Sequence, residues 1–243
     1  MNSFTAVFSS DDATTLDIGT HDFTIRLEPA MRLNGRYAVS LCDLSLWYTW
    51  HNISDLYSNT AFKYWNGVVW KTVYITKGIY DAADLANAIS DLLTAAGDNP
   101  ANLIIEANQN SQKFLITLSA GYQIDFTGLQ IRILFGADNA ILTTSGLMPN
   151  VAQMTNGVNT WILNSDLVDY GISGSHGGKA LHSFSPQVSP GSHIREIPNK
   201  YYVMVKNTPF VESVRFWLTD QRGRPLSIQN EPVSIRLHFS PVA

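Results

Sequence analysis

The last part of the chain shows the clearest alternation of apolar and polar positions. Two segments, 213–219 and 232–239, place an apolar residue at every second position: Val214, Phe216 and Leu218 in the first, and Val233, Ile235, Leu237 and Phe239 in the second. A period of two predicts half-buried β-strands. About a dozen residues separate the two segments, too many for a tight hairpin. We therefore expect two strands that are free to belong to different sheets.

Six other segments carry a strand pattern, namely 21–28, 36–50, 61–65, 68–76, 180–185 and 200–206. Asn66-Gly67 between the third and fourth of these is a strong signal for a two-residue hairpin turn. In 36–50 the alternation slips near Cys42 and Asp43, which predicts a β-bulge. Together with the two C-terminal strands this gives eight. The expected fold is all-β, a single eight-stranded antiparallel jelly roll (a β-sandwich).

The middle of the chain has a different pattern. Asp81 is a candidate N-cap, and apolar residues recur at helical spacing from Leu85 to Leu93 before Gly97 ends the helix. Short strand patterns follow, and 129–135 fits either a strand or a short helix ended by Gly136. We interpret 77–165 as a small α+β insertion between the fourth and fifth strands, within a jelly-roll domain of 21–76 and 166–243.

Residues 1–20 are rich in Ser, Thr and Asp, and this composition favours an N-terminal arm over a core strand. Phe4 and Phe8 are its apolar anchors, and we expect them to dock on a neighbouring subunit. In the outward phase of the last two strands, Arg215, Trp217 and Arg236 also have the character of an interface. These five residues are the predicted contact residues.

Composition supports an assembly surface. Only 15% of the residues are charged, and the chain has six Trp and ten Tyr, which leaves more apolar surface than a monomer needs. A large β core with a polar exterior rich in Ser, Thr and Asn is the alternative explanation. The net charge of −4, without any run of Lys or Arg, argues against direct nucleic-acid binding. No apolar stretch predicts a signal peptide or a membrane span.

The sequence contains no candidate catalytic or metal-binding site. The six histidines are not paired at the spacing of metal ligands, and no Gly-x-Ser-x-Gly motif or defensible pair of catalytic carboxylates occurs. The single Cys42 lies in an apolar run and is expected to be a buried thiol. The sequence therefore predicts neither an enzyme nor a metal or cofactor site. Tryptophans such as Trp47, Trp65 and Trp70 are compatible with sugar-stacking platforms, but core or subunit contacts are the preferred interpretation.

The order of several short motifs resembles one protein family. These motifs are the segment 219–226 (Thr-Asp-Gln-x-Gly-x-Pro-Leu), Asn-Glu-Pro-Val at 230–233 and the final Leu-His-Phe at 237–239, with upstream segments 74–81, 122–126, 133–136, 189–191 and 197–198. In this order they resemble the minor capsid (penton) proteins of Polinton elements, adintoviruses and related virophage-like viruses. The resemblance covers roughly residues 37 to 239.

The resemblance implies a structural viral capsid protein. It implies a penton subunit that forms homopentamers at icosahedral vertices, with itself and a double-jelly-roll major capsid protein as partners and the virion as its location. The insertion would then project from the vertex. The alternative from another class is a trimeric receptor- or carbohydrate-binding β-sandwich, similar to a fibre head or a lectin. A metal enzyme on a cupin-like roll is third, and oligomer number separates the first two.

Overall fold

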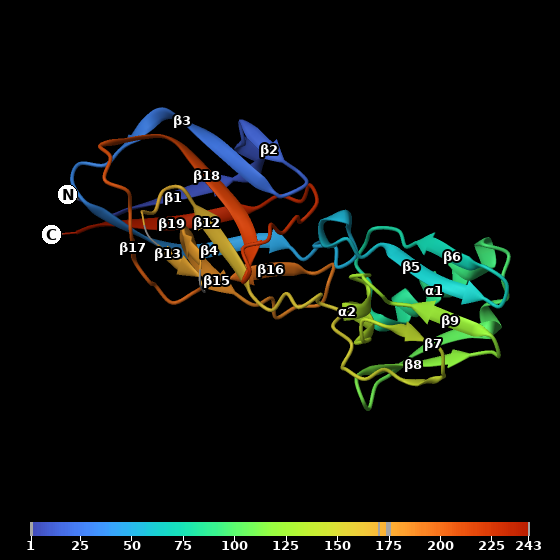
Figure 1. Ribbon diagram of the computed structural model, residues 1–243. Helices are drawn as coiled ribbons and strands as arrows, with labels where there is room; N and C mark the ends of the chain where they lie inside the picture. Colours follow the sequence, from blue (N-terminus) through green and yellow to red (C-terminus); the bar gives the residue numbers. More distant parts are fainter. Residues whose placement is uncertain (1, 170, 174–175, 243) are drawn as a thin grey trace. The chain divides into compact units, whose positions relative to one another are not determined.

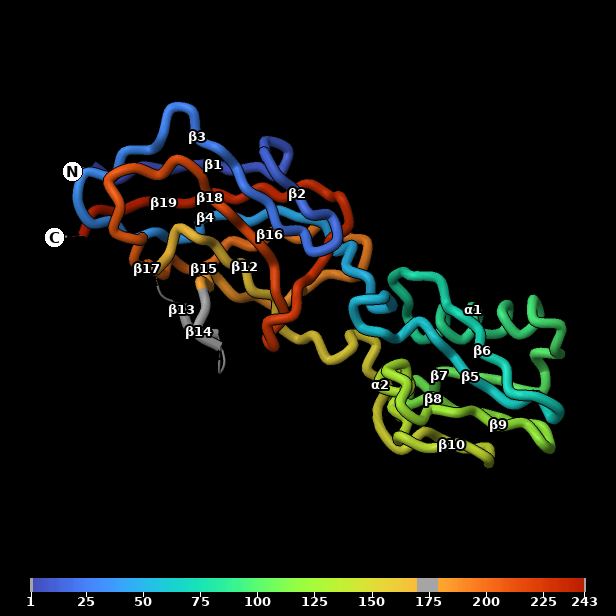
Figure 2. The backbone as a smooth tube through the Cα atoms, turned by 45° about the horizontal axis from the view of Figure 1, so that its top comes forward, coloured from blue at the N-terminus to red at the C-terminus, as the bar shows by residue number. Residues whose placement is uncertain are grey.

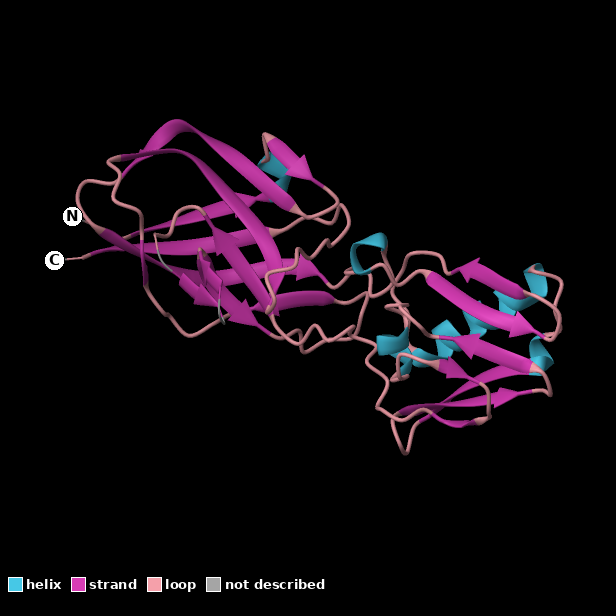
Figure 3. Ribbon diagram, in the orientation of Figure 1, coloured by secondary structure: helices cyan, strands magenta, loops and turns pink. Residues whose placement is uncertain are grey.

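The computed structural model describes residues 2–169, 171–173 and 176–242. The chain forms two compact units (Figure 1). Unit 1 comprises Met1–Trp50 and Val158–Ala243, and unit 2 comprises His51–Gly157. Strands dominate both units, as Figure 3 shows. No helix in the described part of the chain is long and apolar enough to cross a membrane.

Unit 1 contains two antiparallel sheets. Sheet A has the order β1-β19-β4-β16, with β17 also paired to β4. Its strands are β1 (Phe4–Ser9), β4 (Tyr37–Trp47), β16 (His193–Glu196), β17 (Val203–Met204) and β19 (Ser234–Pro241). The first and last strands are neighbours, because Phe4 lies opposite Phe239. The two ends of the described chain therefore lie close together, as the tube in Figure 2 shows.

Sheet B has the order β15-β12-β18-β3-β2. Its strands are β2 (Thr15–Asp17), β3 (Asp22–Arg32), β12 (Trp161–Ser165), β15 (Ala180–Phe184) and β18 (Phe210–Asp220). A short 3-10 helix, η1 (Ser10–Asp12), follows β1, and β13 (Gly171–Ser173) pairs with β14 (His176–Gly178). The segment after β18 leads back to sheet A, so the two C-terminal strands belong to different sheets, as expected.

The two sheets pack face to face as a sandwich with a jelly-roll fold, which confirms the predicted fold class. Phe8 of sheet A and Phe216 of sheet B have ring centroids 5.3 Å apart, and Phe23 lies 5.6 Å from Phe216. The apolar side chains at every second position of the long strands fill this core, since Phe216, Leu44 and Leu46 are completely buried. The pairing of β4 with β19 shifts register between Arg236 and Leu237. That shift is the predicted bulge at Cys42, whose thiol is only half-buried.

Unit 2 combines two sheets with a helix. One sheet has the order β10-β9-β5-β6 and the other β11-β8-β7. The strands are β5 (Ala61–Asn66), β6 (Trp70–Tyr74), β7 (Leu103–Asn108), β8 (Lys113–Leu118), β9 (Tyr122–Asp125), β10 (Ile141–Leu142) and β11 (Gly146–Leu147). The helices are α1 (Ala82–Ala95), α2 (Arg132–Phe135), and the 3-10 helices η2 (Asp55–Tyr57) and η3 (Pro100–Asn102).

Helix α1 begins at the predicted cap, and α2, which starts at Arg132, ends at the predicted glycine. The Asp81 carboxylate accepts a hydrogen bond from the Asp84 amide at 2.7 Å and caps α1. The buried face of α1 joins a core that includes Phe62 and Phe114. Gly136 has a φ of +64° directly after α2, which resolves the ambiguous segment as a short helix rather than a strand.

The unit boundaries differ from the predicted domain boundaries. The hairpin of β5 and β6 was assigned to the jelly roll, but β5 also pairs with β9, with Lys63 opposite Asp125, which places it in unit 2. Strand β12, which was assigned to the insertion, belongs to sheet B. The insertion therefore lies between β4 and β12 and not between the fourth and fifth predicted strands. A hairpin signal is local, and the sequence does not show which third strand pairs with it.

The predicted N-terminal arm is also corrected. Residues Phe4–Ser9 form β1, which pairs with β19, and Thr15–Asp17 form β2, which pairs with β3. The inward positions of β1 are Phe4, Ala6 and Phe8, and the small Ala6 makes the alternation of apolar and polar residues weak. Its strand partner lies at the other end of the sequence, so no local signal marks the pairing.

Candidate subunit-contact surfaces

Arg215 lies on the outer face of sheet B and is held in one orientation. Its guanidinium donates to both carboxylate oxygens of Asp22, with Nε at 2.8 Å from Oδ1, and its Cζ lies 5.0 Å from the centroid of a Trp217 ring. The hydrogen bonds that Arg215 donates to Asp22 raise the pKa of Arg215 above its ordinary value. Half of the side chain, 53%, is exposed. The pair thus presents a fixed cation stacked on an aromatic ring, a combination common at interfaces.

Arg236 lies on the outer face of sheet A, on the other side of the sandwich. Its Nη2 is 2.9 Å from Asp43 Oδ2, and Arg195 Nη2 is 3.2 Å from the same oxygen. Two guanidinium groups therefore share one carboxylate, which leaves this cluster with a net positive charge. Both arginines are at least half exposed, at 51% and 60%.

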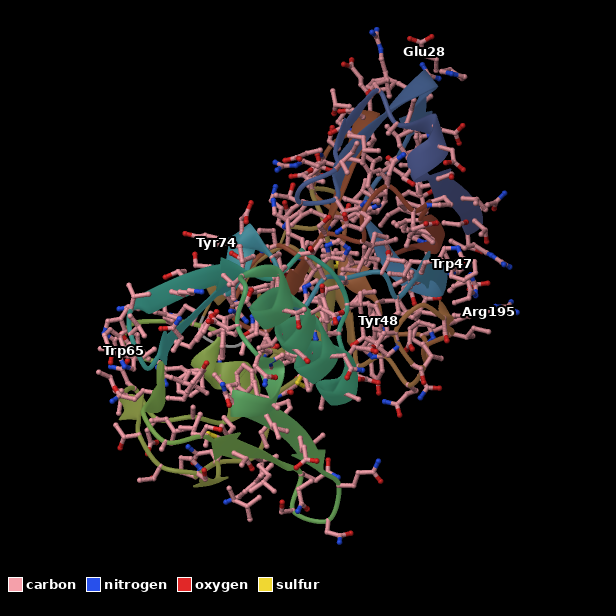
Figure 4. The ribbon with its side chains drawn as sticks, turned by 90° about the vertical axis from the view of Figure 1, so that its right-hand side faces the viewer. Glu28, Trp47, Tyr48, Trp65, Tyr74 and Arg195 are labelled. Atoms are coloured by element: carbon pink, nitrogen blue, oxygen red, sulfur yellow. The ribbon has the colours of Figure 1, made fainter. Side chains whose placement is uncertain are left out.

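Aromatic and imidazole side chains extend this outer face. Trp47 on β4 and His193 on β16 pack edge to face with centroids 5.3 Å apart, and the His193 Nε2 lies 2.8 Å from Ser45 Oγ. Tyr202 Oη lies 2.8 Å from Nδ1 of His238 on β19. Figure 4 shows Trp47 and Arg195 close to each other on the surface. Of these residues, only Trp47 was named from the sequence, as one of the tryptophans expected in core or subunit contacts.

Phe4 and Phe8 face the interior of the sandwich. Phe8 is only 5% exposed, so its side chain is part of the core and does not reach the surface of the protomer. Phe4 stacks on Phe239 with centroids 4.8 Å apart and packs against the edge of Tyr37. Instead of anchoring an arm on a neighbour, both residues pack within their own chain, Phe8 buried and Phe4 half-buried, because β1 is paired to β19.

The five predicted contact residues therefore do not form one patch. Arg215 and Trp217 lie on sheet B, Arg236 lies on sheet A, and the two phenylalanines lie between the sheets. Sheet A ends at β1 and β16, and sheet B ends at β15 and β2. In the part of the chain that the structure describes, no three His, Cys, Asp or Glu side chains are grouped so as to hold a metal ion.

The fold defines a class of protein, an antiparallel jelly roll that carries an α+β unit inserted after its strand β4. Comparison with solved structures identifies the mavirus penton protein as similar, with a TM-score of 0.54 and 12% sequence identity over 99% of this chain and 100% of the other. The chain thus shares the fold of the mavirus penton protein. A chain in the structure of the Sputnik virophage has a TM-score of 0.44 and 13% identity over 97% of both chains. No family model matches the sequence, and no curated protein matches it either.

Proposed function

We propose that this protein is a penton subunit, a structural capsid protein without catalytic activity that forms homopentamers at icosahedral vertices. The observation that supports this proposal is the match to the mavirus penton protein along the full length of both chains. Both parts of the fold, the jelly roll and the inserted unit, are covered by that match. Its proposed location is the virion, and its proposed partners are further copies of itself and a double-jelly-roll major capsid protein. For this role we expect no cofactor, no direct binding to nucleic acid and no insertion into a membrane.

The edges and outer faces of the sandwich support such an assembly. Among the described strands, β1 and β16 lie at the edges of sheet A and have a strand partner on one side only, and a closed ring of subunits covers such edges. We propose that the stacked pair of Arg215 and Trp217 contacts one neighbour and that Arg236 lies on a second contact surface. Phe4 and Phe8 act from the interior by fixing β1 in place.

The test is the mass of the purified protein in solution, measured by light scattering with negative-stain class averages. Five copies of the 26.9 kDa chain have a mass of about 134 kDa and three have about 81 kDa. A mass near the larger value with five-fold averages supports the proposal. A stable trimer overturns it in favour of a receptor- or carbohydrate-binding β-sandwich. If the protein is monomeric, addition of the major capsid protein must produce pentamers, and failure to do so also overturns the proposal.

Substitutions locate the contacts. We expect the double variant Arg215→Ala with Trp217→Ala, and separately Arg236→Ala, to shift the protein from pentamer to smaller species while leaving its circular dichroism unchanged. Lys77→Ala removes an exposed cation from unit 2, where it pairs with Asp55, and serves as the control that keeps the pentamer. Pentamers that persist in both contact variants overturn the assignment of these residues.

A further inference from the structure

The sheet β10-β9-β5-β6 of unit 2 has one face that the core does not use. Phe62 and Tyr64 on β5 are completely buried in the core with α1. Because side chains alternate along a strand, Lys63 and Trp65 project from the opposite face. The strand register sets Trp70 beside Trp65, Thr72 beside Lys63 and Tyr74 beside Ala61. We call this surface the aromatic face and define it by Trp65, Trp70 and Tyr74.

The three rings stand on adjacent strands without being part of a core. The ring centroids of Trp65 and Trp70 are 5.6 Å apart, and the two ring planes are inclined at 59° to each other. Tyr74 is 68% exposed, since the residue opposite it is the small Ala61. Figure 4 shows Trp65 and Tyr74 at the periphery of unit 2. The surface is therefore an open aromatic platform and not a pocket.

The aromatic face is electrically neutral. Lys63 Nζ lies 2.8 Å from Asp125 Oδ2 and 5.0 Å from the centroid of a Trp70 ring. Lys63, the cation on the outer side of β5 and β6, is thus paired with a carboxylate of the neighbouring strand β9. A phosphate or sulfate group would find no unpaired cation here, and a cationic peptide would find no unpaired carboxylate. A ligand complementary to this surface carries no charge.

Unused hydrogen-bonding groups surround the rings. Gln123 lies opposite Trp65 on β9, and Thr72 is exposed between Trp70 and Tyr74. Among the residues that the structure describes, no hydrogen bond is formed by the side chains of Gln123 and Thr72 or by the indole nitrogens of Trp65 and Trp70. Amide, hydroxyl and indole groups are donors and acceptors that match the hydroxyl groups of a sugar.

We propose that the aromatic face binds a neutral oligosaccharide of gluco-configured pyranoses. Such sugars have equatorial hydroxyls, so that one ring face presents only axial C–H bonds. These partially positive hydrogens pack on the negative face of an aromatic ring, while the hydroxyls at the edge of the sugar bond Gln123 and Thr72. An extended chain of sugars fits a row of rings better than a single sugar does, because no enclosed cavity surrounds one residue. This site does not depend on the proposed function in capsid assembly.

The test uses the full chain with two neutral probes, cellohexaose and the hexamer of N-acetylglucosamine, followed by tryptophan fluorescence and by calorimetry. We expect binding with dissociation constants of about 0.1–1 mM for at least one probe. Trp65→Ala and Tyr74→Ala should each weaken it by about tenfold or more. Trp47→Ala, which removes an exposed tryptophan from unit 1, is the matched control and should leave the affinity unchanged.

Three results overturn the proposal. The first is no response to either neutral probe at about 10 mM. The second is an affinity that Tyr74→Ala leaves unchanged. Because Tyr74 is exposed, this variant should fold normally and therefore tests the contact itself. The third is tighter binding of a sulfated heparin hexasaccharide than of the neutral probes, because that preference contradicts a neutral surface. The solution mass of Trp65→Ala and Tyr74→Ala should equal that of the unaltered protein, so a failure here is distinct from a failure of the pentamer.

Discussion

Unit 1 and unit 2 differ in how the chain closes them. Unit 1 is built from two separated segments, and its first strand pairs with its last. Unit 2 is one continuous segment with its own helix and its own aromatic core. A continuous segment with a separate core meets the conditions for independent folding, whereas the jelly roll needs both ends of the sequence. We therefore expect unit 2 to unfold as a unit of its own.

The two units also bury their polar groups differently. In unit 1, His21 is completely buried, and neither ring nitrogen has a hydrogen-bond partner among the described residues. In unit 2, Asp98 is nearly buried but accepts hydrogen bonds from Tyr64 Oη at 2.6 Å and Asn66 Nδ2 at 3.0 Å and pairs with Lys71 at 2.9 Å. One group is unpaired and neutral and the other is paired and charged, so the units should respond to acid in different pH ranges.

The largest expected effect comes from deleting one ring in each core. Phe135 lies within 4.8 Å of the Phe114 centroid and 5.6 Å of the Phe126 centroid, and Phe135→Ala should destabilise unit 2 by about 3–5 kcal/mol. Phe216→Ala should destabilise unit 1 by a similar amount. Hydrogen exchange resolved by segment checks this, because each variant should lose protection in its own unit only. Loss of protection across both units in either variant contradicts independent unfolding.

A second way to separate the units is a substitution that strains only unit 2. A Cβ at position 136 would lie 2.3 Å from the carbonyl oxygen of Asn150, and the φ of +64° is unfavourable for alanine. We expect Gly136→Ala to lower the unfolding free energy of unit 2 by about 2–4 kcal/mol. Gly97→Ala, at a φ of +81° with nothing within 4 Å of its Cβ, is the control and should cost about 1 kcal/mol. Equal thermal shifts for the two variants would show that the backbone near Asn150 relaxes.

The third prediction concerns the acid response of unit 1. Burial lowers the pKa of His21 from 6.5 to about 4. Between these values the unfolded chain binds a proton that the folded chain does not, so stability falls as the pH drops from 6.5 toward 4. The loss should reach about 2–3 kcal/mol. Chemical denaturation at several pH values checks this. His21 has a φ of +48°, which asparagine tolerates, so His21→Asn should flatten the curve in that range. An unchanged slope in the variant would assign the effect to another group.

The smallest effect is expected from the charged cluster of unit 2. Burial alone raises the pKa of Asp98, but the hydrogen bonds from Tyr64, Lys71 and Asn66 outweigh it and lower the pKa to about 2. The cluster therefore contributes stability above the ordinary value of 3.8, and this contribution is lost as the pH falls toward 2. At neutral pH, Asp98→Asn should cost about 1–2 kcal/mol.

The matched control for this cluster is Asp91→Asn on the exposed side of α1, which should leave stability within about 0.5 kcal/mol. The measurement is segment-resolved hydrogen exchange at neutral pH and near pH 3. If Asp98→Asn destabilises unit 1 instead, the two units are energetically coupled.

Local patterns predicted most of the elements. The alternation in 213–219 and 232–239, the Asn66-Gly67 turn, the cap at Asp81 and the bulge at Cys42 were all identified from neighbouring residues. The errors concern pairing over long distances. Strand β1 pairs with β19, and β5 pairs with β9. Nothing near either strand marks its partner, since register is fixed by packing across the finished sheet.

The exposure of the proposed contact residues was predicted in part. The outward phase of the last two strands placed Arg215, Trp217 and Arg236 on the surface, where the structure has them half-buried or exposed. Sequence phase alone does not show that Asp22 and Asp43 hold the two arginines, because these carboxylates lie on other strands. The same limit applies to the aromatic face: Trp65 and Trp70 were recognised as candidate platforms but assigned to a core or an interface, and Tyr74 was not recognised.

The pairing of β1 with β19 has a consequence for synthesis on the ribosome. Phe239, the partner of Phe4, is synthesised about 235 residues later. At a translation rate of 5–20 residues per second this delay is roughly 10 to 50 s. Unit 2 emerges complete during this interval and is free to fold, while sheet A still lacks the strand that joins β1 to β4. The nascent jelly roll thus spends most of its translation with unpaired strands, and slowing translation of unit 2 should increase the need for a chaperone that shields them.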